Sequence, residues 1–224
     1  MWIILVSLFV FAKGEIDCNK HLFEQCPKPK LFREIPWEVN VFKALCPELS
    51  SYIKCLRDYD MKCREEDKRI FKKPETSENL IALFDEICDE GSAFNEIATS
   101  NLKCFNETFS NTNCRQETDD FVKLYEKEIP VDEFITSHVI PERVYCLSQI
   151  LLAGCLLEDI NRNCGIRVRH ATLEYLHRSD FVDGSCPLSY RESLLPDIDE
   201  FNLTEEQKTF AISELERMKI SDEV

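Results

Sequence analysis

The chain is patterned for α-helices. Apolar residues recur at intervals of three and four, the spacing that gathers side chains on one face of a helix. The clearest example is residues 77–89, whose apolar face comprises Leu80, Leu83, Phe84, Ile87 and Cys88. Ser77 is placed to cap the start of this helix, and Gly91 to end it in the left-handed conformation. Alternation of the strand type is nowhere sustained, so the pattern predicts an all-α fold.

Proline and glycine residues mark the expected ends of other helices. Pro47 is expected to be the first residue of one helix, since proline is tolerated in the first turn. Pro141 is expected to open the longest helix, which Gly165 ends. The same periodicity predicts further helices over residues 94–105, 121–128 and 166–176.

The N-terminal residues predict a signal peptide. Residues 2–12 form an apolar run in which Ser7 is the one polar residue, far short of the roughly 20 residues that span a bilayer. Ala12 and Gly14 then supply the small residues that suit cleavage before Glu15. This length and these flanks disfavour an uncleaved anchor or a core strand. We therefore expect a secreted, extracellular protein with no later membrane-spanning segment.

Twelve cysteines follow the expected cleavage point and support the same compartment. An even number in an oxidising compartment predicts six disulfides, and the absence of any CxxC pair argues against a zinc ribbon. The predicted disulfide cysteines are Cys18, Cys26, Cys46, Cys55, Cys63, Cys88, Cys104, Cys114, Cys146, Cys155, Cys164 and Cys186. Their pairing is open, except that Cys146, Cys155 and Cys164 are too widely spaced along one helix to pair with one another.

Two further features concern the surface and the tail. Sequons predict N-glycosylation of Asn106, expected at an exposed edge, and of Asn202. Residues 187–202, which contain two prolines, are expected to form a linker. Thr204 and Gln207 then form a capping box at the start of a C-terminal amphipathic helix.

The predicted organisation is a signal peptide over 1–14, a disulfide-stapled helical domain over 15–186 and an acidic linker and helix over 187–224. Because the last part carries no cysteine, we expect it to be dispensable for the fold. Cys46, Cys55 and Cys63 are spaced almost as Cys146, Cys155 and Cys164 are, which suggests two related halves, roughly 18–90 and 91–186. Coincidence in a cysteine-rich chain explains the spacing equally well.

The cysteine series resembles a family of secreted nematode and arachnid proteins, the nineteenth catalogued domain of unknown function. The resemblance rests on the Cys88-x15-Cys104 spacing and on Cys146-x8-Cys155-x8-Cys164-Gly165 followed by Cys186, and it covers residues 18–186. It implies a secreted helical fold and carries over no catalytic residue. Insect odorant-binding proteins are also helical and cysteine-rich, but their closely spaced C-x3-C is absent here.

Charge and missing motifs exclude several functions. The net charge of −15 repels phosphate backbones and anionic lipids, so we expect no nucleic-acid or membrane-surface partner. HExxH, GxSxG and P-loop motifs are missing. The four histidines, among them His170 and His177 on one helix, form no metal-ligand pattern. The acidic run Asp197–Glu200 lacks the ligand loop of an EF-hand. We predict no catalytic residue, metal site or cofactor.

Two functional hypotheses remain. The first is a non-enzymatic extracellular binding or carrier protein, whose partner is a protein or a small apolar ligand. The phenylalanines Phe84, Phe94, Phe105 and Phe121 could line a pocket for such a ligand, although filling the core is the more common role of aromatic residues on a helix face. The alternative is a secreted enzyme with an unrecognised carboxylate and histidine site. The sequence leaves the oligomeric state open.

Overall fold

The structure is a computed structural model that describes residues 16–30, 35–65, 70–71, 73–132 and 135–221. The predicted signal peptide lies outside the described residues. The first six helices are α1 (Leu22–Gln25), α2 (Val39–Cys63), α3 (Pro74–Cys88), α4 (Ala93–Ser100), α5 (Leu102–Asn111) and α6 (Cys114–Tyr125). A hairpin of β1 (Lys127–Asp132) and β2 (Ile135–Val139) follows. The chain then forms α7 (Glu142–Cys164), α8 (Ile166–Arg178), η3 (Asp183–Ser185), α9 (Leu188–Asp197), η4 (Ile198–Glu200) and α10 (Glu205–Ser221).

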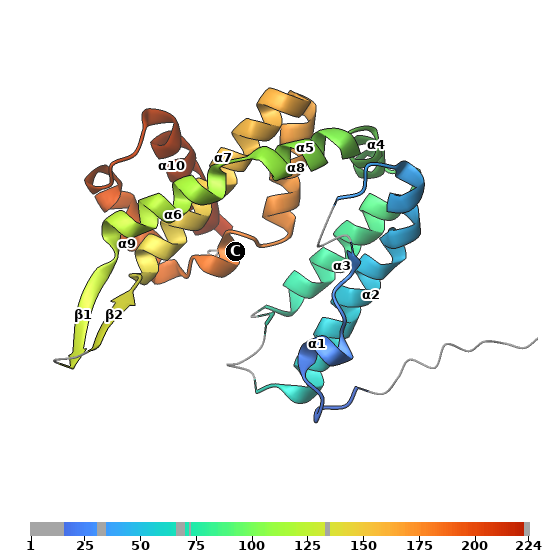
Figure 1. Ribbon diagram of the computed structural model, residues 1–224, viewed down its shortest axis with the longest axis horizontal. Coiled ribbons are helices and arrows are strands. Elements are labelled where there is room, and N and C mark those ends of the chain that lie inside the picture. The colour runs from blue at the N-terminus through green and yellow to red at the C-terminus, as the bar shows by residue number, and fades with distance from the viewer. Residues whose placement is uncertain (1–15, 31–34, 66–69, 72, 133–134, 222–224) are drawn as a thin grey trace, which may run out of the picture.

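The helices form an elongated arrangement with a group at each end (Figure 1). α1, α2 and α3 make up one end, while α6, α7, α9 and α10 make up the other. α4, α5 and α8 lie between them, and α8 contacts both α3 and α4. The described part of the chain is thus mainly helical, and the predicted all-α class is confirmed.

The hairpin is the β-structure of the described residues. A helix was expected over 121–128, but α6 ends at Tyr125 and β1 pairs with β2 in antiparallel register, with Lys127 opposite Val139. Pro130 explains the change, because proline offers no backbone N–H to a helix and disfavours helical geometry at the residue before it. In Figure 1 the hairpin projects away from the helices.

Some predicted helix ends were wrong. Pro47 does not open α2 but lies inside it, because the buried Phe42 and Cys46 continue the same apolar face toward the N-terminus. Ser77 is buried within α3, which begins at Pro74. Gly91 does not adopt the left-handed conformation. Gly165 is the positive-φ glycine of the described chain, with φ of 89°.

The predictions for α7 and for residues 94–105 were partly correct, and the prediction for α8 was confirmed. Pro141 and Gly165 flank α7 as expected, although α7 has 23 residues and α2 has 25. The helix expected over 94–105 is split at Asn101 into α4 and α5. α8 confirms the helix expected after Gly165.

All twelve cysteines are paired. The six disulfides are Cys18–Cys63, Cys26–Cys55, Cys46–Cys88, Cys104–Cys164, Cys114–Cys155 and Cys146–Cys186. As expected, the three cysteines of α7 do not pair with one another but join it to α5, to α6 and to the segment after η3. Each disulfide lies wholly within residues 18–90 or 91–186, which are called the first half and the second half below.

The order of pairing is the same in both halves. Numbering the six cysteines of each half in chain order, the first pairs with the fifth, the second with the fourth and the third with the sixth. Six cysteines allow fifteen pairings, so two unrelated sets of six would share one pairing order in only about one case in fifteen. The structure therefore favours a duplicated unit, in which α2 corresponds to α7.

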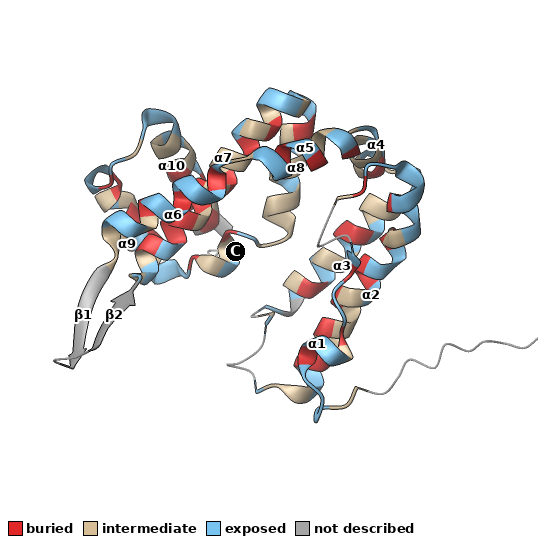
Figure 2. Ribbon diagram, in the orientation of Figure 1, coloured by how far each residue is buried: buried red, intermediate tan, exposed pale blue. Residues whose placement is uncertain are grey.

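The hydrophobic core is divided between the halves, as the buried helix faces in Figure 2 indicate. One cluster joins α1, α2 and α3 around Leu49, Ile53 and Phe84. A larger cluster surrounds α7 and includes Leu147, Ile150 and Leu151. No disulfide joins the halves. They are connected by contacts of α8, among them an ion pair of 2.6 Å between Arg178 and Glu86.

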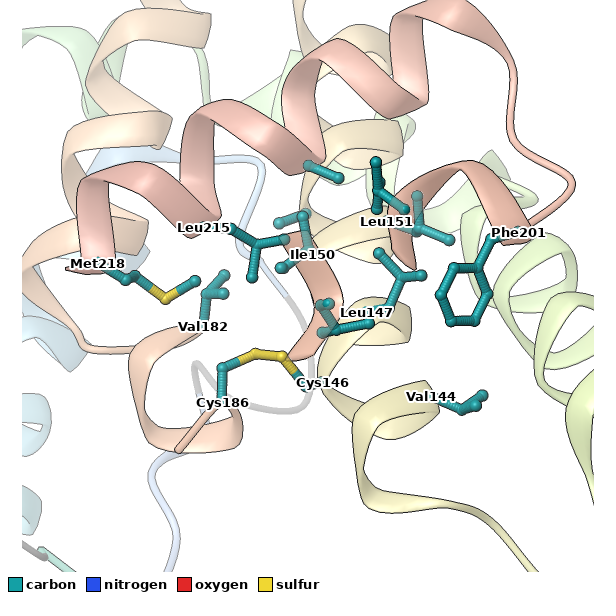
Figure 3. Close-up of a cluster of buried hydrophobic side chains, with 14 of the residues drawn as sticks. Val144, Cys146, Leu147, Ile150, Leu151, Val182, Cys186, Phe201, Leu215 and Met218 are labelled. Carbon is teal, nitrogen blue, oxygen red and sulfur yellow. A yellow bond between two sulfur atoms is a disulfide. The ribbon is translucent and has the colours of Figure 1, made fainter. Parts of the chain in front are cut away.

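The tail is part of this second core, which corrects the expected linker. Residues 188–200 form α9 and η4, and Leu194, Leu215 and Met218 are fully buried. Figure 3 shows Leu215 and Met218 directed toward Ile150 and Val182. The apolar positions of the tail could be recognised in the sequence, but the surface of α7 on which they pack could not. The capping box is confirmed, with Thr204 N–H donating to Gln207 Oε1 at 2.9 Å.

α7 is long and apolar enough, by length and composition, to cross a membrane. Half of its most apolar window is buried inside the protein, and three disulfides tie α7 to its neighbours. Both features are typical of the central helix of a folded core.

Candidate functional site

An apolar cavity lies where the two halves meet, and it is called the junction cavity below. Its volume is about 300 Å³, at the lower end of the range of about 300–1,000 Å³ that small-molecule sites occupy. It is lined by Ile35, Phe42, Leu49, Phe84, Ile87, Phe94, Ile97, Ala98, Leu102, Phe105, Phe109, Ala171, Thr172 and Tyr175. The first half supplies α2 and α3 to its wall, and the second half supplies α4, α5 and α8.

Helical periodicity brings these residues to one space. Phe42 and Leu49 are seven residues apart on α2, which places them on one face. Ala171 and Tyr175 are four apart on α8 and share a face in the same way. The cavity exists because small side chains, Ala98 and Ala171, lie where larger ones would fill the space between the halves.

The aromatic predictions divide between core and cavity. Phe84 and Phe121 are buried in the two cores, as the core interpretation expected. Phe94 and Phe105 are only half-buried and line the junction cavity, together with the exposed Phe109. Phe105 and Phe109 stack with ring centroids 6.3 Å apart. The prediction of a pocket is therefore correct for Phe94 and Phe105, two of the four phenylalanines proposed from the sequence.

Tyr175 is one of the lining residues that the sequence analysis did not predict. Its ring packs near Phe84, with centroids 6.3 Å apart, and burial raises the pKa of its hydroxyl. This hydroxyl makes no hydrogen bond with any residue that the structure describes. The i, i+4 relation to Ala171 could have identified it, because both residues lie on the apolar side of the predicted helix.

The junction cavity contains little other polar chemistry. Thr172 is its second hydroxyl, and Thr172 Oγ1 donates to the carbonyl of Val168 at 2.9 Å. None of the lining residues is charged. The guanidinium of Arg178 lies 5.5 Å from the ring centroid of Phe94 and is paired with Glu86.

Asn106 does not lie at an exposed edge, which corrects the prediction for this sequon. Asn106 is buried, and its side-chain nitrogen donates to the carbonyl of Ile35 at 2.6 Å. Asn106 and the buried Leu102 lie four residues apart on α5, which turns the sequon inward. The other predicted glycosylation site, Asn202, is exposed.

The histidines form no catalytic arrangement among the described residues. His177 Nε2 contacts Glu214 Oε1 at 3.0 Å, and Arg217 bridges Glu214 and Asp183. Burial works to raise the pKa of Glu214, but the hydrogen bonds and positive charges of His177 and Arg217 outweigh it and hold the pKa below its ordinary value. His177 is half-buried because Glu214 of α10 lies against it, and the group ties α10 to α8 and η3.

The remaining histidines and acidic residues suggest no metal centre. His21 and His170 are exposed, and the side chain of His138 lies outside the described residues. Asp197 pairs with Arg143 at 3.1 Å and Asp199 with Lys208 at 2.8 Å, so cations of the chain already neutralise this acidic run.

One group has the spacing of metal ligands. Atoms of Cys114, Cys155 and Asp159 lie within 4.8 Å of one another. The two cysteines form a disulfide, however, so neither provides the thiolate that a metal would need.

A larger groove of about 730 Å³ lies beside α7 and α10. Its lining mixes charged with apolar side chains, and its carboxylates include Asp159 and Glu158, which pair with Arg162 and Arg169 at 3.1 and 3.4 Å. Among the described residues, the junction cavity is the better candidate, since its lining is apolar and its few polar groups converge on one helix.

Comparison with known proteins does not extend this description. No family model, curated protein or solved structure matches the chain. The resemblance to the nematode and arachnid family therefore rests on cysteine spacing alone and stays a prediction.

Proposed function

We propose that the protein is a secreted, non-enzymatic carrier that holds a small apolar ligand in the junction cavity. The observation that supports this most directly is the cavity itself, an apolar space between two helical halves that their own side chains leave unfilled. Filling such a space with a ligand adds dispersion contacts and removes apolar surface from water.

The disulfides favour the same role. Cys46–Cys88 joins α2 to the end of α3, and Cys104–Cys164 joins α5 to the end of α7, next to α8. Each half therefore holds its share of the lining residues in place before a ligand arrives. A wall that is ordered in advance costs less conformational entropy on binding. Six disulfides are also typical of extracellular proteins.

The test is binding of the neutral fluorescent probe N-phenyl-1-naphthylamine to the purified, fully oxidised chain. Ala171→Phe places a ring in the cavity and is expected to weaken probe binding at least about tenfold, because the probe and the ring compete for one space. Ala98→Phe enters the same cavity from α4 and should act in the same way. Ala93→Phe, at the exposed start of α4, is the matched control and should bind like the unchanged chain.

Thermal unfolding of each variant separates blocked binding from misfolding. A variant that melts like the unchanged chain but no longer binds the probe supports the proposal. Equal probe binding by Ala171→Phe, Ala98→Phe and Ala93→Phe, with folding intact, would contradict it. In that case a protein partner becomes the leading function, to be identified by cross-linking in the source fluid.

The enzyme alternative is tested separately. The chain would be assayed against ester, glycoside, phosphate and peptide substrates, and turnover lost in a single carboxylate or histidine variant would establish it. His177→Gln and Glu214→Gln are the variants to include, because these two residues form the His–carboxylate contact of the described chain.

A further inference from the structure

We propose that the ligand of the junction cavity is an uncharged amphiphile, such as an alcohol, whose single polar group hydrogen-bonds to the hydroxyl of Tyr175. This inference rests on the proposed carrier function and assigns the chemical class that the cavity accepts. It also gives Tyr175 the role of a specificity-determining residue.

The lack of charge in the wall carries the first part of the inference. None of the lining residues is ionisable at neutral pH, and burying an ion without a partner costs far more than burying a hydrogen-bonded neutral group. Arg178 lies beside Phe94 of the wall, but its contact with Glu86 at 2.6 Å already neutralises it. A carboxylate drawn to Arg178 would have to break this ion pair and remain beside Glu86. The net charge of −15 adds a further penalty for an anionic ligand.

The polar groups of the wall carry the second part. Thr172 commits its hydroxyl proton to the carbonyl of Val168, so it can only accept from a ligand. The hydroxyl of Tyr175 has no described partner, so it is open to donate to a ligand oxygen or to accept from one. Because burial raises its pKa, this hydroxyl stays protonated at and above neutral pH. Thr172 and Tyr175 are three residues apart on α8 and thus neighbours on its surface.

These groups suit a ligand with one polar end. An oxygen that meets Tyr175 is satisfied, while the rest of the molecule lies against the rings of Phe84, Phe94 and Phe105. A second polar group on the ligand would face aliphatic or aromatic carbon and remain unsatisfied, at a cost of about 1–3 kcal/mol. The wall therefore selects for a single polar group as well as for neutrality.

The experiment displaces N-phenyl-1-naphthylamine with decan-1-ol or with decanoate at pH 8, where decanoate is ionised. The two competitors share a chain length and differ at the polar end. We expect decan-1-ol to displace the probe at a concentration at least about tenfold lower than decanoate, because burying the ion costs more than burying the alcohol.

Tyr175→Phe tests the hydrogen bond. This variant should bind decan-1-ol about three- to tenfold more weakly, as expected for the loss of one neutral hydrogen bond. Its melting temperature should be nearly unchanged. Tyr145→Phe is the matched control, because Tyr145 is exposed and does not line the cavity. It should bind decan-1-ol like the unchanged chain.

The outcomes separate this inference from the carrier function. If decanoate competes as well as decan-1-ol, the uncharged class is wrong while the carrier function stands. If decan-1-ol is preferred but Tyr175→Phe binds it unchanged, the role of Tyr175 is wrong. If the probe itself does not bind the unchanged chain, both the carrier function and the ligand class fail.

Discussion

The two halves share a disulfide order but use their central helices differently. Cys46 and Cys55 of α2 correspond to Cys146 and Cys155 of α7, so positions between them correspond at an offset of 100. Leu147 and Leu151 are buried in the second half, whereas their counterparts Pro47 and Ser51 are exposed. The second half thus buries a helix face that the first half leaves to solvent.

The tail accounts for this difference. α9 and α10 pack on α7, and their buried residues belong to the same cluster as Leu147. Gly154 permits the contact, since a Cβ atom at this position would lie only 2.7 Å from Cδ1 of Phe210. The counterpart of Gly154 is Lys54, a half-buried residue whose amine lies 3.8 Å from Asp85. The second half therefore carries a helical segment with no counterpart in the core of the first half, and the apolar face of α7 accommodates it.

Removal of the tail is the strongest test of this comparison. A chain that ends at Ser189 would retain all twelve cysteines but lose buried residues including Leu194, Leu215 and Met218. Each fully buried side chain of this kind contributes about 1.5–3 kcal/mol, so the second half should lose at least about 5 kcal/mol of stability.

Hydrogen exchange would locate the loss produced by this truncation. The backbone amides of α7 should exchange fast in the truncated chain. Those of α2 should still exchange slowly, because the core of the first half contains no residue of the tail. An unchanged melting temperature and unchanged exchange in α7 would show that the tail is dispensable after all.

Substitutions at corresponding positions of α2 and α7 should change the free energy of unfolding in opposite directions. Leu147→Ala removes a fully buried side chain and is expected to destabilise the protein by about 2–5 kcal/mol. Pro47→Ala at the corresponding exposed position is expected to stabilise it, because proline is about 3 kcal/mol less favourable than alanine inside a helix. Ser51→Ala should change stability by less than about 0.5 kcal/mol. Urea denaturation measures all three, and a loss of stability in Pro47→Ala would contradict the correspondence.

The helical class could be predicted from the sequence because it depends on local periodicity. The even number of cysteines predicted that all of them form disulfides, and Gly165 predicted the end of α7. The sequence did not predict the place of the tail or of Asn106. Leu215 and Met218 show the correct helical spacing, but whether such a face docks depends on a groove built by distant residues. The junction cavity could not be predicted for the same reason, since it depends on how the second half places Ala98 and Ala171 against the first half.

The ionic group at the tail should make the stability of the second half depend on pH. Glu214 has a pKa below its ordinary value of 4.5 in the folded protein, so its contribution is complete above pH 4.5 and is lost as the pH falls through the folded-state pKa. Glu214→Gln should therefore be less stable than the unchanged chain at pH 7, by about 1–3 kcal/mol, with a smaller difference at pH 3.

Glu216→Gln is the control for this pH dependence. Glu216 lies on the same helix and is exposed, so its substitution should leave the pH profile of unfolding almost unchanged. Urea denaturation at several pH values gives the comparison. A difference between Glu214→Gln and the unchanged chain that is constant from pH 3 to pH 7 would show that the carboxylate charge of Glu214 contributes nothing.

The two sequons should give the smallest energetic effects and the clearest difference in mass. Asn202 is exposed and should carry a glycan, whereas the side-chain nitrogen of Asn106 is buried and bound to the carbonyl of Ile35 at 2.6 Å. In protein from a glycosylating host, Asn202→Gln should remove all N-linked mass and leave stability unchanged. Asn106→Gln should leave the glycan mass unchanged and cost about 1 kcal/mol for the lost hydrogen bond. Intact-mass spectrometry before and after glycosidase treatment measures both. A glycan on Asn106 in folded protein would mean that its contact with Ile35, a residue of the cavity wall, does not form.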